Sequence, residues 1–599
     1  MIRSLGYYLS RPGYYLSVAY YDMPFRIFFS ILILKLLLFT YITGLGTESF
    51  FPSFGIILAI SSFSILIRNH FIKFFYLFSL NFLCSLLFFT HSLYLSYFGD
   101  FASAYHLNQM HQLGAVGDII IGMINKEILF IIDLPFWPFL LFRKKVSNYN
   151  IPSKISVLVF LLLLSLVFNI NPLTFNKRSR DNFFESIYYR HAFVSRMGII
   201  NYQIVDVYYY LLTRIQKGQV SQSDIDAVIN WKRHNKVEIR NDLTEKGKGL
   251  NLIVIQVESL QNFVIGRSYN GREITPNLNK LVKSGIYFKN IYDQTADGNS
   301  SDATLLVNSS LYPSRKGAAS FLYSQNYFDS VPKALAEHGY TTAAMEAYKK
   351  HFWNNLAFDK GLGFEYQFYE NSYIMADTIG GFLRGLSDKS FFHQSIGKIK
   401  KLPTPFYVFL RTLSTHAPFA HITADLDDFP LSELEGELIG YYIRAMHYVD
   451  SAIGEFLDEL HENNLASNTI IVVYGDHRAR LPESELKRIG VYDLNENRKI
   501  PLIINLPNRK EKDERDTIGG LIDVAPTICN ILGIDISDRF FMGRDLGHRG
   551  NSFVIFRDGS FMPQDGSMNK TLARHRLMIS DLILEKDMIP LTRNKQNCQ

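Results

Sequence analysis

Three residues of the types that bind a divalent metal ion follow two short apolar runs. Glu258 comes after NLIVIQV, and Asp476 with His477 comes after TIIVVY. Two carboxylates and an imidazole suit Mn²⁺, Zn²⁺ or Mg²⁺ rather than a metal that prefers thiolates. Each residue alone is weak evidence, because an acidic residue after a strand is often only a helix cap or an ion-pair partner. Together they predict a catalytic metal site, in which one position stays open for a nucleophile or substrate.

The stretch ADGNSSDATLLVNSSLYP offers a hydroxyl group for that open position. Ser300 precedes the apolar run ATLLV and is expected at a helix N-terminus, where backbone N–H groups and the helix dipole favour an alkoxide and a phosphate. The alternative is that Ser300, Ser301 or Asp302 serves only as an N-cap. With the distant ligand set present, we expect Ser300 to be the nucleophile and the next two residues to be caps.

The elements that must position these side chains alternate between strands and helices. Strands are expected at residues 251–257, 341–345, 405–412, 469–474, 501–506 and 552–556, and the clearest helical periodicity spans 441–464. This alternation predicts a mostly parallel, doubly wound α/β sheet. Ligands bind such sheets beyond the carboxyl ends of the strands. Glu258, Glu346, His416 and the Asp476–His477 pair all follow a predicted strand.

The first part of the chain is expected to span a membrane. Five stretches come close to the length of about 20 mostly apolar residues that a span needs; they are 27–46, 51–67, 74–98, 127–142 and 155–170. Lys and Arg gather before the first stretch and in alternate loops, and such residues stay on the cytoplasmic side. The N-terminus is therefore expected inside, and an odd number of spans places the rest of the chain outside.

Two charged residues lie within these spans at a similar depth. Lys35 falls near the middle of the first span and Asp133 near the middle of the fourth. A charge in the hydrocarbon is costly, so we expect the two to pair. The alternative is that the long Lys35 side chain reaches the membrane surface.

The sequence divides into four parts. They are a transmembrane domain at 1–171, a helical extracytoplasmic linker at 172–249, a catalytic domain at 250–560 and a C-terminal tail at 561–599. The formal charge is +6, most of it beside the spans, so it does not indicate nucleic-acid binding. Three cysteines are too few for a disulfide framework.

Several motifs in order resemble one family. NLIVIQVESLQNFVIG, TPNLNKL, GNSSDA, FWNN, LSTHAPF, VVYGDHRAR and LIDVAPTICNILGI are similar to the lipoteichoic acid synthase group of the alkaline phosphatase and sulfatase superfamily. The resemblance covers most of 251–547, and a five-span anchor with a linker also matches. It implies a sulfatase-like enzyme outside the bacterial cytoplasmic membrane. Such enzymes move phosphoglycerol from phosphatidylglycerol through a covalent phospho-enzyme, with one bound metal ion, often Mn²⁺.

The resemblance also implies roles for single residues. Ser300 falls at the nucleophile position, where Thr is commoner. Glu258, Asp476 and His477 fall on the metal ligands, which the nucleophile oxygen completes. His416 matches a His that contacts the substrate, and Trp353 matches a Trp of the pocket.

Two expected substrate-binding positions differ from the family pattern. Glu346 stands where a His is expected and Asn355 where an Arg is expected, and no uncharged side chain replaces a bidentate phosphate-binding cation. Glu346 could favour an ammonium group, although Lys349, Lys350 and His351 nearby oppose this. The donor is expected to be a membrane phospholipid, and the acceptor a glycan, a lipid or a glycerolphosphate chain.

Other functions are open on sequence alone. A phosphoethanolamine transferase of the same superfamily would typically have a GESAR-like opening and a cysteine-rich exported domain, where this chain has VESLQ. A sulfatase needs Cys or Ser where LYPSR has Leu, and a two-metal phosphodiesterase needs a second Asp/His cluster, for which HAPFAHITADLDD contains only candidates. A catalytically silent membrane scaffold would need no nucleophile and ligand set.

Overall fold

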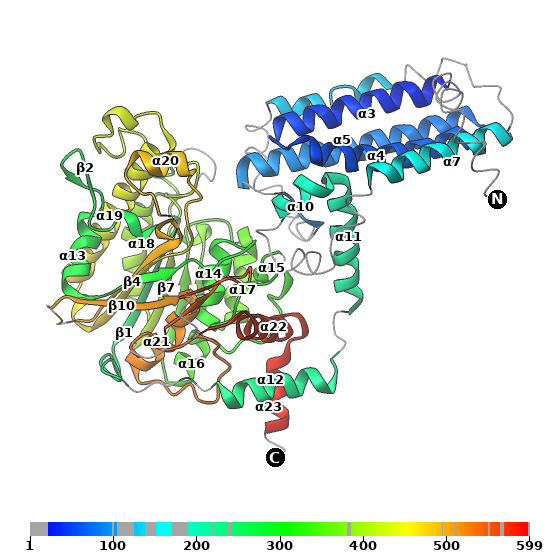
Figure 1. Ribbon diagram of the computed structural model, residues 1–599. Coiled ribbons are helices and arrows are strands. Elements are labelled where there is room, and N and C mark those ends of the chain that lie inside the picture. The colour runs from blue at the N-terminus through cyan, green and yellow to red at the C-terminus, as the bar shows by residue number, and fades with distance from the viewer. Residues whose placement is uncertain are drawn as a thin grey trace. The chain divides into compact units, whose positions relative to one another are not determined.

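The computed structural model consists of two compact units. It describes residues 22–98, 101–104, 125–137, 151–169, 190–216, 220–235, 237, 241–315, 317–350, 352–379, 385–493, 495–507, 509, 511–548, 552–563 and 568–596. The first unit contains the described residues up to Gln216, and the second contains those from Val220 onward. Figure 1 shows the elements of both units.

The first unit is helical. Its helices are α3 (Met23–Ile42), α4 (Thr47–Ser62) with η1 (Phe63–Leu66), α5 (His70–Phe98), α7 (Ile151–Phe168), α10 (Arg190–Met197) and α11 (Ile199–Gln216). Within the described residues, three helices are long and apolar enough to cross a membrane, namely Met23–Ile42, Thr47–Leu66 and His70–Ser96. The predicted count of five spans is therefore not confirmed by the described residues.

The fourth predicted span differs most from its prediction. Its described part forms a short 3-10 helix, η3 (Lys126–Phe130), followed by turns and a further 3-10 segment, and residues 138–142 lie outside the described part. Pro135 lies in this segment and lacks the N–H group that an α-helix would need there. The fifth predicted span coincides with α7, whose described apolar part, Lys154–Phe168, is shorter than the other three.

The predicted pairing of Lys35 with Asp133 is confirmed. Lys35 Nζ lies 2.6 Å from Asp133 Oδ1, and it donates to Asn81 Oδ1 at 3.0 Å and to Ser85 Oγ at 2.6 Å. Trp137 Nε1 donates to Asp133 Oδ2 at 2.8 Å. The buried ammonium group is thus neutralised within the helical unit and does not reach the surface.

The second unit is built on an eight-stranded sheet with the order β10-β4-β9-β8-β1-β7-β5-β6. The strands are β1 (Asn251–Val257), β4 (Ile286–Tyr292), β5 (Thr341–Met345), β6 (Tyr366–Phe368), β7 (Phe406–Arg411), β8 (Thr469–Gly475), β9 (Lys499–Asn505) and β10 (Asp513–Gly520). All neighbours are parallel except that β9 runs antiparallel to β4 and β8. The predicted mostly parallel sheet is confirmed.

Two small hairpins lie outside this sheet. They pair β2 (Ser268–Tyr269) with β3 (Arg272–Glu273), and β11 (Val554–Ile555) with β12 (Phe561–Met562). The predicted strand at 552–556 belongs to the second hairpin and not to the main sheet.

Helices cover both faces of the main sheet. Alternate residues of β1 point to opposite faces, so Leu252 and Val254 join one core and Ile253 and Ile255 join the other. The first core takes in α12 (Gln222–His234), α14 (Ser300–Ser309), α15 (Ala319–Leu322), α16 (Val331–Glu337), α17 (Asn355–Leu362), α21 (Val524–Leu532), α22 (Lys570–Lys586) and α23 (Met588–Gln596). The second takes in α13 (Pro276–Ser284), α18 (Asp388–Ile399), α19 (Leu438–Glu462) and α20 (Glu483–Arg488).

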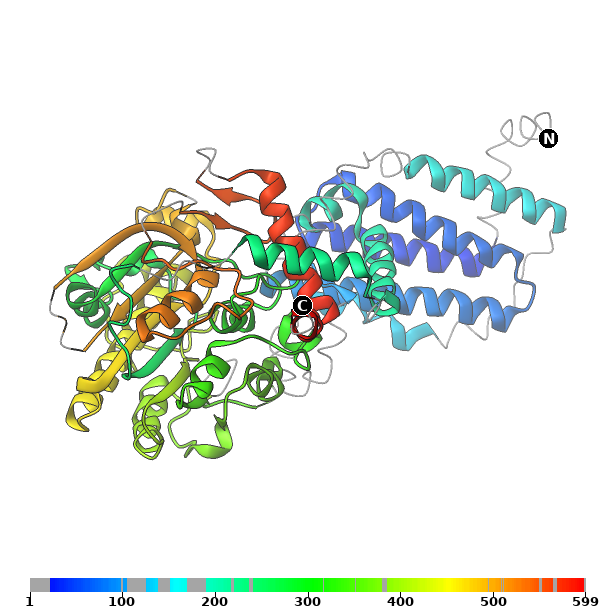
Figure 2. The same cartoon turned by 90° about the horizontal axis from the view of Figure 1, so that it is seen from below.

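The chain's last described helices return to the start of the second unit. Helices α22 and α23, red in Figure 2, pack against α12. Lys586 Nζ pairs with Asp224 Oδ2 at 2.6 Å, which joins α22 to the first turn of α12.

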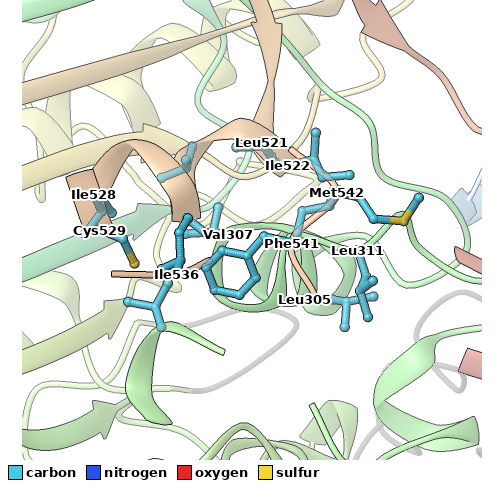
Figure 3. Close-up of a cluster of buried hydrophobic side chains, with 14 of the residues drawn as sticks. Leu305, Val307, Leu311, Leu521, Ile522, Ile528, Cys529, Ile536, Phe541 and Met542 are labelled. Carbon is cyan, nitrogen blue, oxygen red and sulfur yellow. The ribbon is translucent and has the colours of Figure 1, made fainter. Parts of the chain in front are cut away.

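Helix α14, which begins at Ser300, is held by its apolar side chains. Figure 3 shows Leu305, Val307 and Leu311 packed against residues of α21 and of the segment that follows it, including Ile536 and Phe541. Every residue from 301 to 309 is buried. The position of Ser300 is therefore set by a rigid helix and not by a free loop.

We predict that Leu305→Ala destabilises the second unit by about 2–5 kcal/mol, because truncation of a fully buried Leu leaves a cavity. Urea unfolding of the detergent-solubilised chain, followed by tryptophan fluorescence, measures the change. Leu572→Ala is the matched control, since Leu572 is 40% exposed, and it should shift the midpoint very little. Equal shifts for both variants would contradict the packing described for α14.

Candidate functional site

Two neighbouring parallel strands bring the three predicted metal ligands together. Val257 of β1 is in register with Gly475 of β8, so Glu258 and the Asp476–His477 pair leave the sheet at the same edge. Their ligand atoms all lie within 4.8 Å of one another. His477 Nε2 is 3.3 Å from Glu258 Oε1 and 3.6 Å from Asp476 Oδ2.

Backbone and hydroxyl groups fix the orientation of these ligands. The N–H groups of Ser259 and His477 donate to Asp476 Oδ1 at 2.8 and 2.7 Å. Ser259 Oγ donates to Glu258 Oε1 at 2.8 Å. His477 Nδ1 lies 3.0 Å from the carbonyl oxygen of Arg478, which favours the proton on Nδ1 and directs Nε2 toward the carboxylates.

Gly475 lets the two strand ends approach closely. A Cβ atom at this position would lie 1.9 Å from the carbonyl oxygen of Leu260, so no side chain fits without movement of the backbone. The glycine of the VVYGDH motif therefore allows Asp476 to sit beside Glu258.

The cluster carries opposing charges in a buried place. Burial disfavours the ionised form of Glu258, but the charges of His477 and His416 outweigh it and hold the pKa of Glu258 below its usual range. Burial and the neighbouring charge of Glu258 raise the pKa of Asp476. Burial disfavours protonated His477, yet the charges of Asp476 and Glu258 overcome this and raise its pKa. Two adjacent carboxylates thus require positive charge close by.

The residues present fit a divalent cation. Asp476 is fully buried, and its Oδ2 atom accepts no hydrogen bond from any part of the chain that the structure describes. A buried carboxylate oxygen without a partner is costly unless a charge or a donor compensates it. A cation between Oδ2, Glu258 and His477 would do so with the oxygen and nitrogen ligands that such ions prefer.

Ser300 completes this group. Its Oγ atom donates to Glu258 Oε2 at 2.9 Å and lies 3.3 Å from His477 Nε2. Gln256 of β1 donates from Nε2 to the carbonyl oxygen of Ser300 at 3.1 Å, which links the first turn of α14 to the sheet. The structure therefore brings together four residues that sequence reasoning selected from three distant segments.

The expected capping roles of Ser301 and Asp302 are wrong. Asn299 is the N-cap of α14, and the two following residues lie in its first turn. Asp302 Oδ2 instead accepts the backbone N–H groups of Ala296 and Gly298, both at 2.9 Å. A Cβ atom on Gly298 would lie 2.1 Å from Asp302 Oδ1. Asp302 and Gly298 therefore allow the loop before α14 to fold back onto the helix.

His416 lies on the loop that follows β7, and Trp353 lies in the short 3-10 helix η7 (Phe352–Asn354) that follows β5. His416 Nδ1 is 3.0 Å from the carbonyl oxygen of Ala417, and the charge of His416 contributes to the low pKa of Glu258. Trp353 is half-buried, with a left-handed backbone (φ 48°), and its ring lies 5.9 Å from that of Phe321.

Glu346 and Asn355 belong to a buried polar network that the sequence did not reveal. Glu346 Oε2 accepts from Asn355 Nδ2 at 2.7 Å and from Arg411 Nε at 2.9 Å. The Arg411 guanidinium also makes two bonds to Asp359, at 2.9 and 2.6 Å. Glu346 is 5% exposed and paired with a cation, so it offers little to an ammonium group. The sequence feature that could have indicated this network is Arg411, a charged residue at the end of the apolar run PFYVFLR.

Comparisons with known proteins identify relatives of both parts of the chain. The sulfatase family model matches residues 250–534, and the model of the lipoteichoic acid synthase N-terminal domain matches residues 18–219. Lipoteichoic acid synthase 1 of Bacillus subtilis (strain 168) is 30% identical over 548 residues, covering 85% of this chain and 85% of its own length. The lipoteichoic acid synthase of Staphylococcus aureus (strain USA300) is 29% identical over 511 residues, covering 82% and 78%.

The fold has a solved relative. The crystal structure of the lipoteichoic acid synthase LtaP from Listeria monocytogenes aligns with a TM-score of 0.52 and 25% identity, over 63% of this chain and 98% of that one. The sulfatase-like fold and the family resemblance expected from the motifs are confirmed. The chain therefore belongs to the lipoteichoic acid synthase family, with apolar membrane helices followed by a sulfatase-like phosphotransferase domain.

Proposed function

We propose that this protein is a membrane-anchored phosphoglycerol transferase that takes its phosphoglycerol group from phosphatidylglycerol. The observation that carries the proposal is the hydroxyl of Ser300, which begins α14 and donates to Glu258 at 2.9 Å within the carboxylate and imidazole cluster. A hydroxyl at a helix N-terminus and beside proton acceptors is suited to attack a phosphorus atom.

The proposed reaction has two displacements. Ser300 Oγ attacks the phosphorus atom of the donor, the bond from phosphorus to the diacylglycerol oxygen breaks, and diacylglycerol leaves as the alcohol. Glu258 Oε2, 2.9 Å from Ser300 Oγ, is the proposed acceptor of the Ser300 proton, which then passes to the departing diacylglycerol oxygen. An acceptor hydroxyl then attacks the same phosphorus atom, the bond from phosphorus to Ser300 Oγ breaks, and the proton of the acceptor hydroxyl returns to Ser300 Oγ. The acceptor is a glycerolphosphate chain, a glycan or another lipid.

Glu258, Ser300, Asp476 and His477 would hold one divalent metal ion, as the superfamily generally uses. Mn²⁺ is our first choice from the family resemblance, and Zn²⁺ or Mg²⁺ also suit these ligands. When bound, the ion supplies Lewis-acid polarisation and offsets the charge of the two carboxylates.

His416 and Trp353 are proposed to contact the phosphoryl or glycerol group, and His416 to assist proton transfer. Glu346 and Asn355 are proposed to shape the same pocket, because Arg411 fixes the Glu346 carboxylate and that carboxylate in turn accepts a hydrogen bond from Asn355. Since Arg411 neutralises Glu346, we favour a glycerol head group over ethanolamine.

The membrane helices would hold this site at the surface where the donor lies. We propose a cytoplasmic N-terminus and an extracytoplasmic catalytic domain in the bacterial cytoplasmic membrane. An odd number of crossings gives this orientation, whether three or five segments cross. We retain the proposed parts 1–171, 172–249, 250–560 and 561–599 as working boundaries.

We predict that Ser300→Ala lowers diacylglycerol release from fluorescent phosphatidylglycerol by at least about 1000-fold, because removal of a nucleophile removes the covalent route. Ser300→Thr should keep measurable activity, since it retains the hydroxyl group. Ser309→Ala, in the same helix, is the control and should match the wild type. Full activity of Ser300→Ala, or release from phosphatidylethanolamine alone, would refute the proposed reaction.

We predict that the purified full-length chain binds about one equivalent of a divalent metal ion. Glu258→Gln and Asp476→Asn should each lose it, because each removes a charged ligand. Elemental analysis by mass spectrometry measures the content, with the surface variant Glu455→Gln as control. Undiminished metal content in both site variants would show that the ion, if any, binds elsewhere.

A further inference from the structure

An arginine side chain reaches the residue beside the nucleophile. Arg480 lies four residues after Asp476, and its NH2 group donates to Asn299 Oδ1 at 2.7 Å. Asn299 directly precedes Ser300 and is the N-cap of α14, but its side chain makes no capping bond. Arg480 is an exposed residue. The guanidinium group of an exposed residue therefore contacts the residue that precedes the proposed nucleophile.

The backbone on both sides of this contact is strained. Arg480 has φ 53° and Asn299 has φ 42°, in the left-handed region that residues other than glycine seldom adopt. Such conformations persist where the surroundings impose them, and they gather at functional sites. Here the residue before Arg480 is fixed, because the Ala479 N–H donates to Gln261 Oε1 at 3.0 Å. The segment thus holds Arg480 in a costly conformation that turns its side chain toward Asn299.

The negative charge of the site creates a need for a cation that binds the donor phosphate. A phosphodiester donor carries a negative charge and must approach Glu258 and Asp476, which are themselves acidic. Asn355 supplies no positive charge, and Arg411 is occupied by Glu346 and Asp359. Arg480 places a cation against Asn299, the residue before Ser300, and a guanidinium group suits phosphate oxygens in charge and shape.

We propose that Arg480 is a substrate-contacting residue that binds a non-bridging phosphate oxygen of the glycerol phosphate group while Ser300 reacts. This inference rests on the proposed function and adds a residue to it. Asn299 holds the guanidinium group in place for this contact.

The test compares Arg480→Gln and Arg480→Lys with wild type, as full-length protein in detergent. Calorimetry with glycerol phosphate measures binding, and diacylglycerol release from phosphatidylglycerol vesicles measures turnover. Arg480→Gln should weaken glycerol phosphate binding and raise the KM for the donor by about 10- to 100-fold, as expected for loss of a charged hydrogen bond. Arg480→Lys should recover part of this, because it keeps the charge but not the forked geometry.

Arg488→Gln is the matched control, since Arg488 is exposed, lies eight residues further on and pairs with Glu437. It should leave both measurements unchanged, and melting temperatures check the fold of every variant. Unchanged glycerol phosphate binding in Arg480→Gln would overturn the inference. If Arg480→Gln lowers kcat but leaves glycerol phosphate binding unchanged, the inference also fails, because Arg480 would then act only by positioning Asn299. If the wild-type protein releases no diacylglycerol, the proposed function itself is refuted. Failure of the proposed function is thus distinguishable from failure of the inference about Arg480.

Discussion

The site depends on two carboxylates that the sheet places side by side. Glu258 and Asp476 follow adjacent parallel strands in matched register, and both are buried. Their mutual repulsion is tolerable only if positive charge and hydrogen-bond donors surround them. Backbone N–H groups serve one oxygen of Asp476, and His477 lies beside both acids. The remaining oxygen of Asp476 accepts no hydrogen bond within the described part of the chain, and a cation held there would compensate its charge.

The surrounding structure positions the hydroxyl group of Ser300 and the guanidinium group of Arg411 at this edge of the sheet. Apolar packing fixes α14, and Gln256 ties its first residue to the sheet, so Ser300 reaches Glu258 from a rigid element. Arg411, the last residue of β7, joins Glu346 to Asp359, and Asn355 at the start of α17 donates to Glu346. Rigid support of this kind is what a site needs to hold reacting groups within fractions of an ångström.

Local patterns predicted those parts of the molecule that depend on nearby residues. The apolar runs at 251–257 and 341–345 became β1 and β5 without a shift, because buried parallel strands have continuous apolar sequences. The sequence therefore also predicted that Glu258 and the Asp476–His477 pair, which follow such strands, lie at the same edge of the sheet. Three strands of the main sheet were missed. In β4 the polar pair Lys289–Asn290 interrupts the apolar run, β6 has three residues, and β10 is the polar run DERDTIGG. Partners far apart in sequence, such as Arg411 with Glu346 and Arg480 with Asn299, leave no local pattern. Asp302 was misread because its acceptor role depends on how the loop folds back.

The central claim is that phosphoglycerol passes through a covalent bond to Ser300. The most direct measurement is acid quenching of the full-length protein during turnover of isotope-labelled phosphatidylglycerol, followed by peptide mapping with mass spectrometry. The account predicts one glycerophosphoryl group on Ser300, which appears before product and disappears when acceptor is added. A labelled group on another residue, or steady turnover by the wild type with no labelled peptide, would contradict it.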